Sequence, residues 1–143
     1  MKLKLIYIIL GVVIIIGLNQ YQVKANNDKL YTYEFDFYEY GVPQNDVSRF
    51  AWKETSSYIQ VNHRSSSHPY KVYAMGAYQE LNNGKYYDCS NGNYCLMGKN
   101  NDVQWLTNYV YEWGYKAAGL KCVYSGDSLF AARGCFFPDS NRY

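Results

Sequence analysis

Short segments in which apolar and polar side chains alternate recur along this chain, and they restrict its fold more than any other feature. Between Leu30 and Tyr40, aromatic side chains at every second position alternate with polar ones such as Thr32 and Glu34. This is the period of a half-buried β-strand. The segments are separated by clusters of Gly, Asn, Asp, Ser or Pro, which favour turns. The pattern therefore predicts an all-β protein built from antiparallel strands.

Further extended segments are expected at 57–62, 70–78, 86–96, 103–113, 120–124 and 129–136. The last two are expected to form a hairpin around Ser125–Ser128, and 86–96 a smaller hairpin of its own. The stretch 105–120 is ambiguous, because apolar residues there also recur at helical intervals; its β-rich centre favours a strand, with a short helix as the alternative. Regular turns and the absence of a long helical pattern predict a small antiparallel β-sandwich, with a barrel as the alternative.

The N-terminus has the features of a secretory signal peptide. Lys2 and Lys4 precede an apolar run from Leu5 to Leu18, and Val23-Lys24-Ala25 fits a cleavage site with small residues. The run is shorter than the roughly 20 residues that a membrane span needs. Cleavage after Ala25 is therefore predicted, with an uncleaved membrane anchor as the alternative. The mature protein would be a single secreted β domain, residues 26–143.

Cleavage would also change the formal charge of the protein. The whole chain carries +2, and the loss of Lys2, Lys4 and Lys24 would leave −1. Nucleic acids and anionic membranes are recognised through concentrated basic charge. No nucleic-acid partner is therefore expected, and membrane contact is expected only through the signal segment if it stays attached.

All four cysteines lie in the mature part of the chain, at Cys89, Cys95, Cys122 and Cys135. An even count in a small exported chain predicts two disulfides. We expect Cys89–Cys95, around a tight turn, and Cys122–Cys135, whose loop would contribute about 3 kcal/mol. In a regular hairpin, however, residue 122 faces residue 131, so Cys135 would have to bend back or pair with the 89–95 loop. Zinc is disfavoured, because Cys-x2-Cys spacing and a neighbouring histidine are both missing.

No constellation in the sequence points to catalysis or to a cofactor. His63 and His68 share a polar loop but have no nucleophile, carboxylate or third ligand nearby in sequence, so we expect them to be solvated. The Gly-x-Ser-x-Gly motif of hydrolases does not occur, and Asn100-Asn101-Asp102 lacks the spacing of a calcium loop. We therefore predict no catalytic, cofactor-binding or metal-binding residue and no enzymatic activity.

Tyrosine is unusually frequent, with 18 residues in the chain. Its flat apolar ring and polar tip suit both the faces of a thin sheet and surfaces that bind sugars or proteins. The simpler interpretation is structural. The alternative is a binding patch for an unknown protein or a cell-surface glycan, formed by Tyr31, Tyr33, Tyr38, Tyr40, Tyr109 and Tyr111.

Three longer motifs, preceded in the chain by Phe35-x-Phe37, give it a resemblance to a known family. They are Ser48-Arg49-Phe50-Ala51-x-Lys53-x-Thr55-Ser56-Ser57, Thr107-Asn108-Tyr109-Val110-Tyr111-Glu112-x-Gly114-Tyr115 and Gly134-x-Phe136-Phe137-Pro138-Asp139-Ser140. The chain resembles an uncharacterised family of small exported proteins of Gram-positive bacteria, which usually end in Gly-x-Trp-Ser-Pro-Asp-Ser. It is more faintly similar to lactococcin-type bacteriocins, which are short exported β-sandwich proteins. Because no catalytic centre is expected, the predicted role is a binding or surface-interaction module. The similarity to bacteriocins implies the alternative, a bacteriocin-like toxin.

The chain departs from that usual ending at Phe136 and Phe137. Successive side chains of a strand point to opposite faces. Phe136 shares the parity of Leu120, Cys122 and Tyr124, so we assign it to the core. Phe137 is then expected on the outer face.

Overall fold

The structure, a computed structural model, describes residues 29–37, 44–80, 85–98 and 102–141. The regular elements of these residues are all β-strands, which confirms the all-β prediction. They are β1 Tyr31–Phe37, β2 Gln44–Val47, β3 Ala51–Trp52, β4 Tyr58–Ser66, β5 Tyr70–Ala77, β6 Tyr87–Asp88, β7 Cys95–Met97, β8 Val103–Leu106, β9 Ala117–Tyr124 and β10 Phe130–Ser140. The predicted signal peptide, Tyr38, Tyr40, Asn100 and Asn101 lie outside the described residues. No helix among the described residues is long and apolar enough to cross a membrane.

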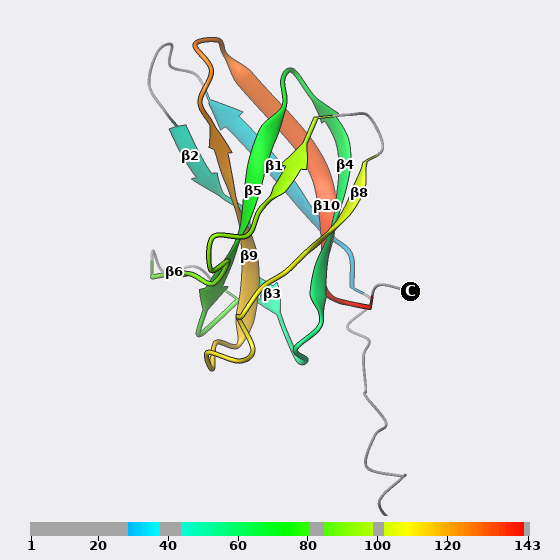
Figure 1. The fold of residues 1–143 in the computed structure, drawn as a ribbon, viewed down its shortest axis with the longest axis vertical. Coiled ribbons are helices and arrows are strands. Elements are labelled where there is room, and N and C mark those ends of the chain that lie inside the picture. Colours follow the sequence, from blue (N-terminus) through cyan, green and yellow to red (C-terminus); the bar gives the residue numbers. More distant parts are fainter. Residues whose placement is uncertain (1–28, 38–43, 81–84, 99–101, 142–143) are drawn as a thin grey trace, which may run out of the picture.

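The strands form two antiparallel sheets that pack face to face (Figure 1). One sheet, here sheet A, has the order β1-β10-β4-β8. The other, sheet B, has the order β2-β9-β5-β6, with β3 also pairing with β9 and β7 with β5. Two separate sheets make a sandwich, so the barrel alternative is not the one adopted.

The hairpin predicted around Ser125–Ser128 is wrong, although both of its strands exist. β9 pairs with β5 in sheet B, whereas β10 lies between β1 and β4 in sheet A. The connection therefore crosses from one sheet to the other. Alternation in the sequence shows which face of a strand is buried, but not which strand lies next to it.

The segments 86–96 and 103–113 also differ from expectation. β6 and β7 both pair with β5 rather than with each other. β8 ends at Leu106, and residues 107–116 form a compact loop, closed by a hydrogen bond from the Tyr115 N–H to the Val110 carbonyl at 3.0 Å. Gly114 adopts φ +82° in this loop, a left-handed conformation that glycine tolerates without strain. The structure therefore has neither the full predicted strand nor the alternative helix.

The core lies between the two sheets and follows the alternation read from the sequence. On β1, Tyr33, Phe35 and Phe37 are buried, in phase with the predicted strand. Phe136 is fully buried, with its ring centroid 5.7 Å from that of Tyr31, and Phe137 is half-buried. The assignment of Phe136 to the core is confirmed.

The four cysteines are free and buried, so the two predicted disulfides are wrong. Cys122 lies on β9 and belongs to the core between the sheets. Cys135 lies on β10 of sheet A, next to the core residue Phe136, so its side chain points to the opposite face of that sheet. Because Cys122 faces the core and Cys135 faces away from it, the two thiols do not meet.

Cys89 and Cys95 are held at successive inward-facing positions along β5. The Cys89 N–H donates to the Ala74 carbonyl, and Cys95 lies opposite Val72. Positions two residues apart on one strand are about 6.7 Å apart. This is at the upper limit of the usual Cα–Cα distance across a disulfide, and both thiols are free in the structure.

Candidate functional site

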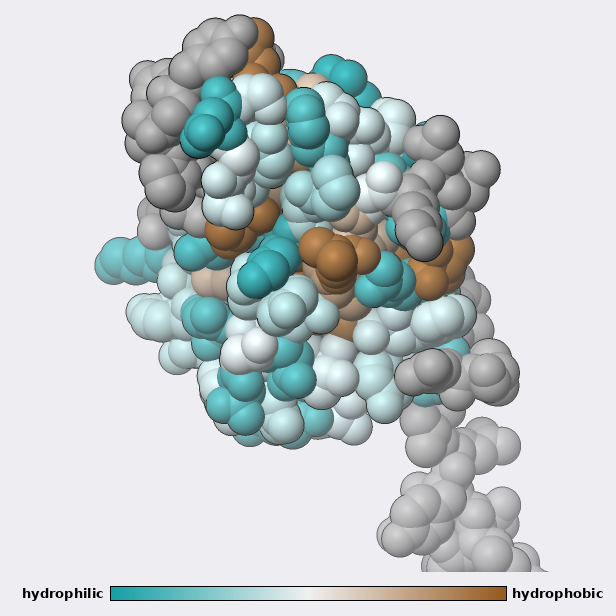
Figure 2. Space-filling view, turned by 45° about the horizontal axis from the view of Figure 1, so that its top comes forward, coloured by the Kyte–Doolittle hydropathy of each residue, from teal (hydrophilic) through white to brown (hydrophobic). Residues whose placement is uncertain are grey.

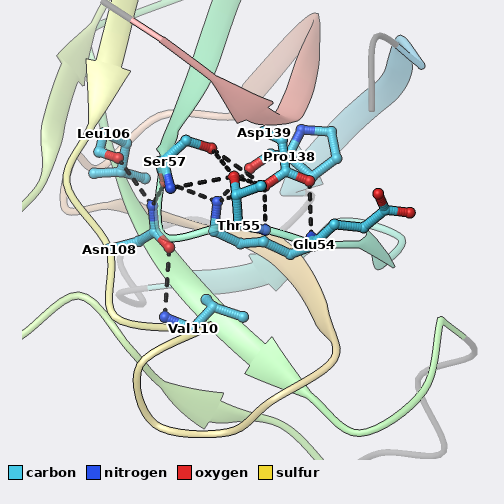
Figure 3. A network of polar contacts seen from close by, with 9 residues as sticks. Glu54, Thr55, Ser57, Leu106, Asn108, Val110, Pro138 and Asp139 are labelled. Atoms are coloured by element: carbon cyan, nitrogen blue, oxygen red, sulfur yellow. Dashed lines mark hydrogen bonds and ion pairs between the residues drawn. The ribbon is translucent and has the colours of Figure 1, made fainter. Parts of the chain in front are cut away.

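The C-terminal motif joins the segment that connects β3 to β4. The Asp139 carboxylate accepts hydrogen bonds from the backbone N–H groups of Glu54 and Thr55 at 2.9 and 3.1 Å. It also accepts bonds from the hydroxyls of Thr55 and Ser57, at 2.8 and 3.2 Å (Figure 3). Two parts of the chain that lie far apart in sequence are fastened together at this carboxylate, which we call the Asp139 clamp.

Lys53 supplies the buried positive charge of the clamp. Its ammonium donates to the carbonyls of Ser57 and Pro138, at 2.7 and 2.6 Å, and lies 3.3 Å from the Asp139 carboxylate. Both charged side chains have zero exposure. The three acceptors match the three N–H donors of a charged lysine.

The pKa values at the clamp show how the charges are held. Burial lowers the pKa of Lys53, and the carboxylate of Asp139 opposes this. Burial by itself raises the pKa of Asp139, but the Glu54 N–H, the Lys53 charge and the Thr55 donors outweigh it, so the pKa lies below its ordinary value. Because the pair is enclosed and satisfied, it serves to stabilise the fold rather than to contact a ligand.

Asn108 ties the 107–116 loop to the same region. Its side-chain amide donates to the carbonyls of Ser57 and Leu106, at 3.0 and 3.4 Å. Its oxygen accepts the N–H of Val110 at 3.4 Å, and Figure 3 shows the side chain lying between these groups. All three motifs of the sequence analysis therefore meet at one end of the sandwich.

A pocket of about 220 Å³ lies beside this anchor. Its walls are the segments 56–58 and 107–112, and the lining residues are Ser56, Ser57, Tyr58, Thr107, Asn108, Tyr109 and Glu112. Hydroxyl, amide and carboxylate groups share this space with two tyrosines. The pocket was not predicted, because its two walls come together only through the clamp and Asn108.

Comparison with known proteins places the chain in a family. Residues 21–140 match the family described as protein of unknown function, DUF2712. The chain belongs to the DUF2712 family. This confirms the expectation of an uncharacterised family, and the matched region contains the three motifs. No curated protein and no solved structure matches the chain.

Exposed aromatic side chains of this DUF2712 protein surround the 107–116 loop. Tyr109 and Trp113 stack, with ring centroids 5.5 Å apart and planes 19° apart, and Trp113 is 48% exposed. On the same loop, Tyr115 stacks on Tyr87 at 5.2 Å and lies 5.1 Å from Tyr78. The loop is therefore the centre of an aromatic surface.

The tyrosine patch proposed from the sequence is not this surface. Tyr33 is buried and Tyr31 half-buried, because both belong to the inward face of β1. Tyr109 and Tyr111 do lie on the aromatic loop, and Tyr111 is 50% exposed. Sequence spacing could not separate inward-facing tyrosines from exposed ones across different elements.

The two histidines of this DUF2712 member do not share a solvated loop. β4 extends to Ser66 and buries His63, whose Nδ1 lies 3.0 Å from the Tyr70 hydroxyl; Tyr70 in turn bonds the Tyr33 hydroxyl at 2.9 Å. Burial lowers the pKa of His63, with Asp102 opposing. His68 is exposed, as expected, and approaches the Ser128 hydroxyl at 3.4 Å. Among the described residues, no group of three His, Cys, Asp or Glu could hold a metal ion.

A second pocket, of about 360 Å³, lies between β7 and β8 and is lined by Pro69, Leu96, Met97, Gly98, Asp102 and Gln104. Gln104 spans from one sheet edge to the other, donating from its side chain to the Leu96 carbonyl at 2.6 Å. On the face of the molecule seen in Figure 2, hydrophobic side chains form small groups with hydrophilic ones around them. Of the residues that line the second pocket, Asp102 and Gln104 carry polar side chains.

Proposed function

We propose that this protein is an exported binding module that recognises a cell-surface glycan at the pocket formed by 56–58 and 107–112. The observation that carries the proposal is the combination of hydroxyl, amide and carboxylate groups in that pocket with the stacked pair Tyr109 and Trp113. Sugar rings offer hydroxyls to polar groups and C–H faces to aromatic rings. Ligand sites typically combine aromatic surface with a few placed polar groups.

The rigidity of the pocket supports this function. Ser57 is held by the Asp139 clamp and Asn108 by three hydrogen bonds, so both walls are fixed before a ligand arrives. A preformed site loses less conformational entropy on binding. Weak individual contacts with sugar hydroxyls can then add up to a useful affinity.

The pocket favours binding over glycan hydrolysis. Glycoside hydrolysis generally needs two carboxyl groups, roughly 5–9 Å apart, one on each side of the bond that breaks. Among the described residues that line the pocket, Glu112 is the sole carboxylate. Asp139 is enclosed and committed to five donors.

Calorimetric titration of the purified protein with cell-wall polysaccharides and their oligosaccharides tests the proposal. Trp113→Ala removes one ring of the exposed stack and should weaken binding by about fivefold, the equivalent of roughly 1 kcal/mol. Trp52→Ala is the matched control, because Trp52 is similarly exposed, at 44%, but lies on β3 and outside the Tyr109–Trp113 stack. Trp52→Ala should leave the affinity unchanged.

Two results would contradict the proposal: no glycan binds the wild-type protein, or Trp113→Ala and Trp52→Ala affect binding equally. Growth inhibition of related strains by the purified protein, without glycan binding, would instead favour the lactococcin-like toxin. Intact mass of secreted protein beginning at Asn26 would support export with cleavage after Ala25.

A further inference from the structure

We propose that the glycan carries a free, protonated amine, which pairs with Glu112 while its sugar ring occupies the pocket. This inference rests on the proposed function and specifies the class of sugar. It follows from the charge of the pocket, the aromatic rings that line it and its size.

The charge that the described lining of the pocket presents is negative. Among its described lining residues only Glu112 is charged, and its side chain is exposed. Burial lowers the pKa of Lys53, Asp139 opposes this, and Glu112 opposes it further, so Glu112 and Lys53 lie within electrostatic range. Lys53 cannot serve as the partner of Glu112, because its donors point to Ser57, Pro138 and Asp139.

The aromatic lining reinforces the same preference. Tyr58 and Tyr109 both line the pocket, and the face of a tyrosine ring attracts a cation within about 6 Å. The protein uses this contact elsewhere: the Lys71 ammonium lies 4.5 Å from the centre of the Tyr94 ring. A carboxylate beside two tyrosines therefore complements an ammonium group.

The rest of the lining suits a sugar ring rather than a flexible amine. Ser56 and Thr107 offer hydroxyl groups, which match ring hydroxyls. The volume of about 220 Å³ is below the roughly 300–1,000 Å³ of sites for drug-sized ligands. One amine-bearing ring of a longer glycan fits this description better than an extended peptide.

The test compares four ligands by calorimetry at low salt. They are β-1,4-linked glucosamine oligomers, their N-acetylated counterparts, neutral gluco-oligosaccharides and a lysine oligopeptide. Exposed ion pairs contribute up to about 1 kcal/mol, so the wild-type protein should bind the glucosamine oligomers about fivefold more tightly than the N-acetylated oligomers. This difference should shrink as salt is raised.

Two variants test whether Glu112 is the negative charge that pairs with the amine. Glu112→Gln should abolish the preference for the amine and leave binding of the neutral oligosaccharides unchanged. Glu54→Gln is the matched control, since Glu54 is also exposed and its side chain extends away from Asn108 in Figure 3. Glu54→Gln should retain the full preference.

Each remaining outcome has a distinct meaning. Equal or tighter binding of N-acetylated oligomers, or an unchanged preference in Glu112→Gln, would overturn the amine inference and leave the glycan-binding function standing. Binding of the lysine oligopeptide with the affinity of the glucosamine oligomers would show that the amine is recognised without the sugar, and would also overturn it. If no oligosaccharide binds, the proposed function fails and the inference fails with it.

Discussion

At the scale of single residues, adjacent positions on one strand differ in burial and therefore in their contribution to stability. Phe136 has zero exposure and packs on Tyr31, while Phe137 is half-buried on the opposite face of sheet A. Gly134, two residues earlier, has its own constraint: a Cβ there would lie 2.4 Å from both the Asn62 carbonyl oxygen and the Tyr33 hydroxyl. The glycine of the C-terminal motif is thus explained by close packing.

Phe136→Ala should destabilise the protein far more than Phe137→Ala. Truncating a fully buried phenylalanine costs about 3–5 kcal/mol, because it loses apolar burial and leaves a cavity. Phe137→Ala should cost less than about 1 kcal/mol, since that side chain keeps part of its contact with solvent. Denaturant melts of the two variants measure the difference. Equal midpoints, or the reverse order, would show that the burial described for β10 is wrong.

At the scale of elements, β10 holds sheet A together and also carries the clamp. It pairs with β1 on one side and β4 on the other, and its end binds the segment before β4 through Asp139. The clamp and Asn108 set the distance between the walls of the pocket. Changes at the clamp should therefore affect both stability and the proposed binding site.

Asp139→Asn should cost about 3–5 kcal/mol, because it leaves the buried Lys53 charge without its partner. The matched control is Glu34→Gln on β1, which breaks an ion pair with Arg133 whose side chains are 55% and 54% exposed. Exposed pairs contribute about 0–1 kcal/mol, so the control should change stability little. Chemical denaturation at neutral pH compares the variants, and similar losses in both would contradict the account of the clamp.

The loss of stability at acid pH gives a second test of the contribution of the Asp139 clamp. The pKa of Asp139 is lower in the folded protein than its unfolded value, which is about 3.9. The free energy of unfolding that the ionised Asp139 contributes is therefore fully present above about pH 3.9, the unfolded pKa. It is lost as the pH falls through the folded pKa. Wild-type stability should fall below about pH 4, and Asp139→Asn should show a shallower fall.

At the scale of the whole molecule, the sandwich encloses all four thiols. Burial raises the pKa of Cys89 to about 12 and that of Cys95 to about 11, and it raises the pKa of Cys122 still further. The reactive form of cysteine is the thiolate. We expect no thiol to react with an aromatic disulfide reagent in the native protein at pH 8.

In denaturant, four thiols should react per chain, and a Cys135→Ser variant should give three. A count of zero or two in denaturant would show that disulfides form after all. Both counts are made on one sample. The native count shows whether the thiols are enclosed, and the count in denaturant shows whether they are reduced.

The sequence by itself determined the fold class, the positions of most strands and the inward faces of β1 and β10. These depend on alternation within one segment, which local residue order records directly. It also pointed to the three motifs and to tyrosine as a residue of interest. It did not determine the neighbours of each strand, so the hairpins at 86–96 and 120–136 were wrong.

Only the tertiary structure decided what the motifs do. Lys53, Thr55, Ser57, Asn108 and Asp139 are spread over three segments, and no spacing rule brings a carboxylate near the C-terminus to the N–H groups of residues 54 and 55. The same holds for Cys122 and Cys135, which lie on strands of different sheets, β9 and β10. Contacts between distant segments depend on strand order and sheet packing, which are properties of the whole chain.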